Sequence, residues 1–307
     1  MNSAMYLFPG QGSQSVNMLV DIENQFPQIK QTFIEASEAL GFDLWEIVKT
    51  GPVEQLNSTE NTQPAILTAS IAMWRLFAER IEMPKYLAGH SLGEYSALVA
   101  ADVIEFSDAV KLVHARGKFM QQAVADGEGA MAAIIGLDDA SIESACNLAQ
   151  QNQVVSPVNY NSPGQVVIAG HKAAVERAMA NCKEAGAKRA LPLPVSVPSH
   201  CSLMKPAAEQ LQLMLDTIAF TPPSIAVINN VDVATEEQPE AIKKALVKQL
   251  FMPVRWSEII SKADTQGVEK YYECGPGKVL SGLNKRIIKG SQCVALIKPE
   301  EITNITH

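Results

Sequence analysis

Short runs of β-forming residues alternate with longer helical patterns at both ends of the 307-residue chain. The apolar run at 5–8 precedes a glycine-rich loop at 9–14, and the run at 85–88 precedes a helical pattern over 92–104. Strands that alternate with helices in this way are typical of a parallel sheet covered by helices. We therefore predict an α/β fold.

A different order occupies the middle of the chain. Residues 128–195 give strands and helices in the order βαββαβ, which is the ferredoxin-like pattern. Because this unit is complete in itself, we predict a subdomain over 127–195 inserted into a catalytic domain made of 1–126 and 196–307. We also expect a strand over 224–230 and a helix that is capped by Ser107.

Composition excludes several classes of partner. The net charge of −8 argues against nucleic acid, because a phosphate backbone favours a basic surface. No apolar stretch reaches the roughly 20 residues of a membrane helix, and the N-terminus lacks a secretory signal, so we expect no membrane partner. The five scattered cysteines suit a reducing cytoplasm. No CxxC or HExxH spacing occurs, so we expect no metal site.

Residues 89–93 read Gly-His-Ser-Leu-Gly and fit the pattern G-x-S-x-G between an apolar run and a helical pattern. A serine on such a tight turn projects its hydroxyl into open space, and the next N–H points at the same place. This context favours Ser91 as a nucleophile. The alternative is that Ser91 simply caps the helix that follows.

A nucleophilic serine needs a base, and His200 is the best placed of the five histidines. It lies in a proline-punctuated, non-helical segment, and such loops often carry catalytic groups. His90 is adjacent to the serine and should diverge from it, His114 lies mid-helix, His171 opens a helix in the insert, and His307 ends the chain. No acid between Ser91 and His200 has a convincing context, so we expect a Ser–His pair oriented by a carbonyl.

Arg116 lies on the apolar face of its predicted helix, close in register to Leu112, Val113 and Met120. A buried guanidinium must find an anion, because it cannot lose its proton. Periodicity alone favours a structural salt bridge. The functional alternative is a fork that holds a substrate carboxylate.

Several motifs together carry a family resemblance. They are FPGQGSQ at 8–14, TQPAILTAS at 62–70, GHSLGEYSALVAA at 89–101, RGKFMQQA at 116–123, NYNSPGQVVIAG at 159–170, VSVPSHCSLM at 195–204 and ECGPGKVLSGL at 273–283. In this order, across nearly the whole chain, they closely resemble the malonyl-CoA:acyl-carrier-protein transacylases of bacterial type II fatty acid synthesis. The resemblance implies a hydrolase-like α/β domain with a ferredoxin-like insert.

The resemblance also implies an activity: ping-pong transfer of malonyl from malonyl-CoA to the phosphopantetheine thiol of acyl carrier protein, through a malonyl-serine ester. Ser91 would be the nucleophile and His200 its base. The backbone N–H groups of Gln11 and Leu92 would form the oxyanion hole, and Arg116 would bind the malonyl carboxylate.

Three further residues have roles by resemblance alone. Gln249 would orient His200, which explains the missing acid, and Asn159 and Asn161 would line the cleft between the domains. No permanently bound cofactor is implied. Acyl carrier proteins are acidic, so we expect a local basic patch to dock one; the candidates are Lys188, Arg189, Lys285 and Arg286, with Lys289 nearby.

Three alternatives remain open on the residues. A serine thioesterase would share Ser91 and His200 but would not need Arg116. A non-catalytic module that binds carrier protein would not need an intact nucleophile and base. A discrete acyltransferase of a polyketide synthase would use the same residues and is hardly separable by pattern.

Overall fold

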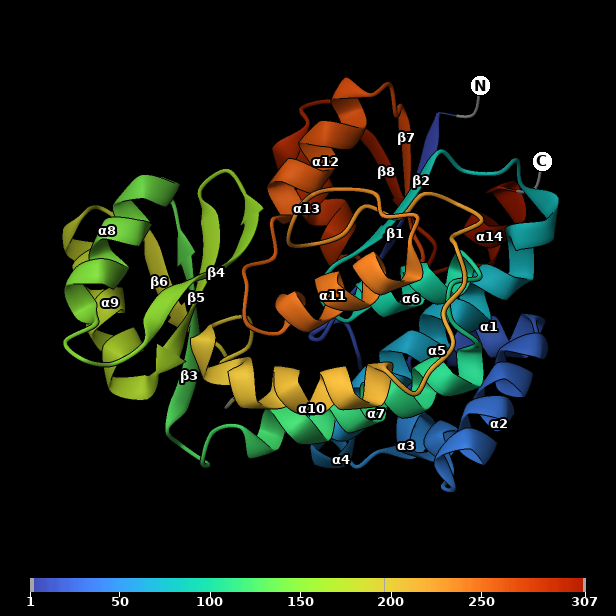
Figure 1. Ribbon diagram of the computed structural model, residues 1–307. Helices are drawn as coiled ribbons and strands as arrows, with labels where there is room; N and C mark the ends of the chain where they lie inside the picture. The colour runs from blue at the N-terminus through green and yellow to red at the C-terminus, as the bar shows by residue number, and fades with distance from the viewer. Residues whose placement is uncertain (1–2, 196, 306–307) are drawn as a thin grey trace.

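The computed structural model of the protein describes residues 3–195 and 197–305. It contains two four-stranded sheets, each with its own helices (Figure 1). His307 and residue 196, where the second part of the predicted catalytic domain begins, lie outside the described residues.

The first sheet is parallel and uses strands from both ends of the chain. Its order is β2 (Tyr86–Gly89), β1 (Ala4–Phe8), β7 (Lys270–Glu273) and β8 (Gln292–Ala295). All three neighbouring pairs are parallel. The N-terminal strand therefore lies between segments that are distant from it in the sequence.

Side chains of β1 alternate between two hydrophobic clusters, as the period of two in a strand requires. Tyr6 and Phe8 belong to the larger cluster and contact Trp74. Met5 and Leu7 belong to the smaller cluster on the opposite face. Both faces of the central strand are thus buried, which explains why its sequence is apolar without interruption.

Helices cover both faces of the parallel sheet (Figure 1). The smaller cluster is covered by α12 (Trp256–Thr265) and α13 (Val279–Ile287). The larger cluster takes side chains from α1 (Val20–Gln25), α2 (Gln28–Leu40), α3 (Leu44–Thr50), α4 (Val53–Asn57), α5 (Thr59–Phe77), α6 (Gly93–Ala100), α7 (Phe106–Gln122), α10 (Lys205–Leu215), α11 (Pro239–Gln249) and α14 (Pro299–Ile305). Two short 3-10 helices accompany these elements: η1 (Ala78–Arg80) follows α5, and η2 (Ser202–Met204) precedes α10.

The second sheet is antiparallel, in the order β4 (Val155–Ser162), β5 (Gln165–His171), β3 (Gly129–Ile135) and β6 (Arg189–Pro192). The helices α8 (Asp139–Ala149) and α9 (Lys172–Glu184) contribute to its hydrophobic cluster. The chain order is βαββαβ, so the predicted α/β fold with an inserted ferredoxin-like unit is confirmed. All four strands fall within 127–195, but the limits of the two domains stay a prediction.

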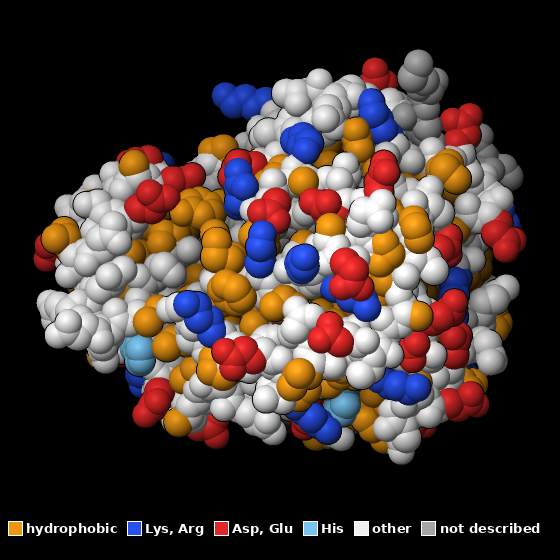
Figure 2. All heavy atoms as spheres, viewed as in Figure 1, with side chains coloured by type: hydrophobic (Ala, Val, Ile, Leu, Met, Phe, Trp, Pro, Cys, Tyr) orange, Lys and Arg blue, Asp and Glu red, His pale blue; other side chains and the backbone are white. Residues whose placement is uncertain are grey.

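Backbone hydrogen bonds join the second sheet to the first unit. Tyr160 of β4 donates to the carbonyl of Val254, and the N–H of Val254 donates to Val158. Apolar side chains also gather in the hollow between the two parts (Figure 2).

Two local predictions were wrong. The helix α7 begins at Phe106, and the preceding residue Glu105 makes no side-chain cap, so Ser107 lies inside the first turn. Residues 224–230 do not form a strand of the sheet. Val227 makes only an isolated bridge to Leu87, and the ladder stops because the N–H of Asn230 is taken by a carboxylate.

Among the described residues, no helix combines the length and the apolar character that a membrane crossing requires.

Candidate active site

The chain turns sharply between the end of β2 at Gly89 and the start of α6 at Gly93. Ser91 occupies this turn in the left-handed region, with φ of 52°. A left-handed conformation costs a non-glycine residue roughly 1–2 kcal/mol, and such strain is typical of functional sites.

The two glycines of the turn are required by close packing of the backbone. A Cβ atom on Gly89 would lie 1.8 Å from the carbonyl carbon of Gly93, and one on Gly93 would lie 2.0 Å from the carbonyl oxygen of Phe8. No side chain fits at such distances. The helix α6 can therefore pack directly against the ends of β1 and β2. Ser91, on the turn between them, lines the cleft.

His200 lies beside the serine, although 109 residues separate the two in the sequence. Its Nε2 is 2.7 Å from Ser91 Oγ, and its Nδ1 is 2.6 Å from the backbone carbonyl oxygen of Gln249. A carbonyl only accepts, so Nδ1 carries the proton and Nε2 presents a lone pair to the hydroxyl. The expected Ser–His pair oriented by a carbonyl is present.

Burial and the nearby positive charge of Arg116 together lower the pKa of His200 to about 3. Desolvation is the larger cause, because removing the imidazole from water disfavours its charged form. The ring is therefore neutral over the whole range near neutrality, as a proton acceptor must be.

This lowered pKa predicts the pH dependence of the acylation that the sequence leads us to expect at Ser91. The basic form of His200 is complete well above pH 3, so titration of His200 should leave the rate of that step nearly the same at about pH 5.5 and about pH 7.5. If the base were a histidine with an ordinary pKa near 6.5, the rate would be about ten-fold lower at pH 5.5 than at pH 7.5. Rapid-quench measurement of the acylation rate distinguishes the two cases.

A second buried group must be controlled in that measurement. Burial raises the pKa of the Glu94 carboxyl to about 7, so Glu94 also titrates within the interval. The same comparison on the Glu94→Gln variant isolates His200. If the acylation rate of Glu94→Gln fell about ten-fold from pH 7.5 to pH 5.5, the lowered pKa of His200 would be contradicted.

A cleft of about 540 Å³ opens in front of the serine. The site residues on its walls are Gln11, His90, Ser91, Leu92, Arg116, Asn159 and His200. Leu92 is the residue before the first helical position of α6, and the first N–H groups of a helix have no partner within it. Gln11 lies in the loop after β1, on the same cleft. The structure thus brings together the two residues whose N–H groups were expected to form an oxyanion hole.

Arg116 is 1% exposed and reaches the cleft from α7. Its Nη1 donates to Gln63 Oε1 at 2.8 Å, its Nη2 donates to Gln249 Oε1 at 3.1 Å, and Nη2 lies 3.5 Å from Ser91 Oγ. Within residues 3–195 and 197–305, no carboxylate forms an ion pair with it. The salt bridge favoured by periodicity is therefore absent from these residues.

Two neutral amides hold the guanidinium in place, and the buried carboxyl of Glu94 attracts it without forming a direct ion pair. A guanidinium has five N–H donors, and the two amide oxygens use two of them. The guanidinium also lies 5.4 Å from the ring centre of Tyr95, which adds a cation–π attraction. The arrangement can accept an anion from the cleft next to the nucleophile.

Gln249 is fully buried and serves the site twice. Its backbone carbonyl orients His200, while its side-chain Nε2 donates to Glu94 Oε2 at 2.8 Å and to the carbonyl oxygen of Ser91 at 3.0 Å. Because both amide hydrogens point that way, the amide oxygen faces Arg116.

The two asparagines of β4 have different positions. Asn159 lines the cleft, and its Oδ1 is buried without a hydrogen-bond partner among the described residues. Asn161 does not line the cleft. Its Oδ1 instead lies 2.8 Å from His90 Nε2, which ties the second sheet to the turn at 89–93 that carries Ser91, called here the nucleophile turn after its predicted role.

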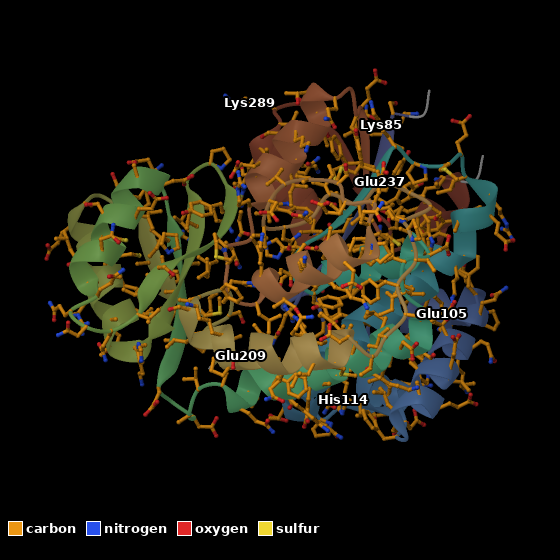
Figure 3. The ribbon with its side chains drawn as sticks, viewed as in Figure 1. Lys85, Glu105, His114, Glu209, Glu237 and Lys289 are labelled. Carbon is orange, nitrogen blue, oxygen red and sulfur yellow. The ribbon has the colours of Figure 1, made fainter. Side chains whose placement is uncertain are left out.

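The other described histidines lie away from the serine hydroxyl. His114 is half-buried and its Nδ1 donates to the carbonyl oxygen of Glu60, at the lower edge of the molecule (Figure 3). His171 accepts from the N–H of Val154 within the insert. No cluster of three or more His, Cys, Asp or Glu that could hold a metal occurs in the described part of the chain.

Sequence reasoning missed three buried residues of this site: Gln63, Glu94 and Asn230. Glu94 follows the serine by three residues, and its position in an otherwise apolar stretch was a usable signal. Gln63 stands inside one of the quoted motifs. Asn230 had no such signal, since it was assigned to a strand.

Comparison with known proteins gives a consistent result. A family model described as "Acyl transferase domain" matches residues 5–281. The chain is 60% identical over 300 residues to the "Malonyl CoA-acyl carrier protein transacylase" of Escherichia coli K12, covering 97% of each chain. It is 59% identical over 304 residues to the protein of that name from Salmonella typhimurium, covering 99% of this chain and 98% of the relative.

Solved structures agree with the sequence relatives. An acyl carrier protein S-malonyltransferase from Vibrio cholerae is 59% identical, with a TM-score of 0.97, over 99% of this chain and 100% of the other. A malonyl-transacylase solved in complex with a type II PKS acyl-carrier protein, PlMCAT:AntF, is 55% identical with a TM-score of 0.97. That match covers 99% of this chain and 98% of the other.

Proposed function

The chain belongs to the family of malonyl CoA-acyl carrier protein transacylases, and on this premise we propose that it transfers malonyl from malonyl-CoA to the phosphopantetheine thiol of an acyl carrier protein, in fatty acid biosynthesis. Membership of this family makes the chain an acyltransferase.

One observation carries the choice of substrate: the guanidinium of Arg116, which makes no direct ion pair with a described carboxylate, lies 3.5 Å from Ser91 Oγ. A carboxylate held there must be close to the carbon under attack. Malonyl meets this condition, since a single methylene separates its carboxylate from its thioester. Acetyl has no anion to place, and a longer diacid must fold its chain to satisfy both contacts.

In the first half-reaction, Ser91 Oγ attacks the thioester carbonyl carbon while His200 Nε2 takes the hydroxyl proton. The N–H groups of Gln11 and Leu92 stabilise the negative charge on the carbonyl oxygen. One such donor contributes about 10²–10³ in rate. The C–S bond breaks, the proton on Nε2 goes to the departing CoA sulfur, and a malonyl-serine ester remains.

In the second half-reaction, the thiol of the phosphopantetheine arm takes the place of CoA. His200 Nε2 accepts the thiol proton as the sulfur attacks the ester, and returns it to Ser91 Oγ as the ester bond breaks. The carrier protein leaves as its malonyl thioester. This is ping-pong chemistry, because the first product departs before the second substrate reacts.

Intact-mass analysis tests the proposal directly. We expect incubation with malonyl-CoA to add one malonyl group to the chain at Ser91, and later addition of acyl carrier protein to move that group to the carrier. Rapid loss of the group to water without carrier protein would indicate a thioesterase. Absence of any adduct would reject the mechanism.

A second candidate has one observation in its favour. A structural relative at 55% identity is solved in complex with a type II PKS acyl-carrier protein. The chain could serve a polyketide carrier with the same residues. Comparing KM for a fatty-acid carrier and a polyketide carrier decides between the two pathways.

The docking surface for the carrier protein is proposed on charge. The basic residues suggested by the sequence are all exposed, in two groups: Lys188 and Arg189 at the start of β6, and Lys285 and Arg286 on α13. Arg286 donates to Gln165 of β5, so α13 meets the insert at this point. Lys289 lies further out, at the upper edge of the molecule (Figure 3). We favour α13, because it borders the junction of the two parts.

Charge reversal on α13 should separate docking from chemistry. We expect Lys285→Glu to raise KM for acyl carrier protein by about ten-fold and to leave acylation by malonyl-CoA within about two-fold. Lys30→Glu, on the distant helix α2, is the matched control. The effect should shrink in high salt, because exposed charges are screened. If Lys30→Glu and Lys285→Glu raise KM equally, net charge and not a docking site is responsible.

No step above requires a resident cofactor; malonyl-CoA and phosphopantetheine enter as substrate and as part of the partner. All five cysteines are free and buried, which supports a reducing cytoplasm as the compartment.

A further inference from the structure

The left-handed turn at Ser91 must be held by its surroundings, because its backbone conformation is intrinsically unfavourable. The backbone N–H of Glu94 donates to the carbonyl oxygen of Ser91, as the first turn of α6. The side chains that contact the backbone of Ser91 are Asn230 and Gln249, both more than a hundred residues away in the sequence.

Asn230 is fully buried and spans the turn with its side-chain amide. Its Oδ1 accepts from the backbone N–H of Ser91 at 2.7 Å, and its Nδ2 donates to the carbonyl oxygen of Gly89 at 2.7 Å. One rigid amide therefore fixes the distance between the carbonyl oxygen of Gly89 and the N–H of Ser91.

Glu94 holds Asn230 in turn. Glu94 Oε2 accepts from the backbone N–H of Asn230 at 3.0 Å and from Gln249 Nε2 at 2.8 Å. Gln249 Nε2 also donates to the carbonyl oxygen of Ser91. Both polar backbone groups of Ser91 are thus bonded to buried amides, and the next residue, Leu92, lines the cleft.

We propose that Asn230 is a positioning residue, which holds the backbone of Ser91 so that Oγ faces His200 Nε2 and the N–H of Leu92 faces the substrate oxygen. The inference rests on the proposed role of Ser91 as the acyl acceptor. It assigns to Asn230 an effect on the rate of acylation, not on the binding of malonyl-CoA.

Asn229 provides a matched control, because it is adjacent and also buried. Its Oδ1 accepts from the N–H of Asp232 at 2.8 Å, and its backbone N–H donates to Ala234. It makes none of the contacts to the nucleophile turn. A loss of stability common to both asparagines can therefore be separated from an effect on the serine.

The experiment compares Asn230→Ala with Asn229→Ala in the full-length chain. We expect Asn230→Ala to lower the single-turnover acylation rate by about 10²-fold, as a misplacement of about 1 Å can do, with KM for malonyl-CoA changed by less than about three-fold. Asn229→Ala should lower the thermal midpoint similarly and keep the acylation rate within about three-fold.

The near-isosteric Asn230→Asp variant adds a second measurement, the pH dependence of the acylation rate. A residue that only stabilised the fold would not change this pH dependence. An ionised Asp at this position accepts from Ser91 but repels the carbonyl oxygen of Gly89, whereas a protonated Asp can donate to that oxygen. Its acylation rate relative to the unmodified chain should therefore rise as the pH falls. This variant also decides the question if Asn230→Ala does not fold.

The outcomes separate the inference from the proposed function. If the unmodified chain takes no acyl group, the proposed function and this inference fall together. If it is acylated and Asn230→Ala reacts at the same rate, or loses no more than Asn229→Ala, the inference alone is overturned. A pH-independent ratio for Asn230→Asp would overturn it as well.

Discussion

Replacing Ser91 by alanine should abolish the malonyl adduct and lower malonyl transfer by about 10⁴-fold or more. Removing either the nucleophile or the base of such a pair leaves only the catalysis that comes from binding and the oxyanion hole. His200→Ala should have an effect of similar size, and the double variant should be no worse than either single one. Steady-state transfer to carrier protein measures all three.

His114→Ala is the control for the loss of a histidine. His114 is half-buried on α7 and bonds the backbone of Glu60, so its variant tests disturbance of the same part of the fold. It should retain transfer within about three-fold. Additive losses in the Ser91/His200 double variant would show that the two residues do not act as one unit.

Replacing Arg116 by alanine should lower malonyl transfer by about 10²–10³-fold, because the two charge-assisted hydrogen bonds proposed for the substrate carboxylate would be lost at once. Transfer of acetyl, which has no carboxylate, should fall much less or rise. The ratio of kcat/KM for malonyl-CoA to that for acetyl-CoA is the quantity to measure.

Arg116→Lys refines the same prediction. An ammonium keeps the charge but cannot bond both amide oxygens and a carboxylate in one plane, so malonyl transfer should recover only in part. Lys118→Ala, two residues further along α7, should leave the ratio unchanged. An equal loss of malonyl and acetyl transfer in Arg116→Ala would contradict the proposed fork.

The strands and the nucleophile turn were predictable because their signals are local. The run at 5–8 is apolar at every position, as a strand buried on both faces must be. The glycines at 89 and 93 mark a turn whose backbone leaves no room for a Cβ atom. The period of 3.6 over 106–122 placed Arg116 on the buried face, where the structure has it.

The partners of those residues were not predictable from periodicity. The expected anion for Arg116 is replaced by Gln63 and Gln249, since amide oxygens also satisfy a buried guanidinium. No local pattern distinguishes a glutamine that will hold an arginine from any other. Gln249 itself was assigned through resemblance, 158 residues from the serine.

The strand predicted at 224–230 is absent for a similar reason, because tertiary partners that no local pattern reveals take its polar groups. β-Branched residues at 225–228 favoured a strand, and Val227 does reach Leu87. The segment leaves the sheet because Asn230 gives its N–H to Glu94 and its side chain to the nucleophile turn. A tertiary contact thus overrides a local propensity.

The parallel sheet combines the first third of the chain with its last third, and the site likewise needs Gln249 from the last third beside Ser91 from the first. This sets an order of events during synthesis. Residues 91 and 249 are separated by 158 positions. A ribosome that adds roughly 5–20 residues each second needs on the order of ten seconds or more to make that interval. The Ser91 hydroxyl is therefore made well before the carbonyl of Gln249 that orients His200, and on the proposed mechanism we expect a chain that ends before residue 249 to form no malonyl-serine ester.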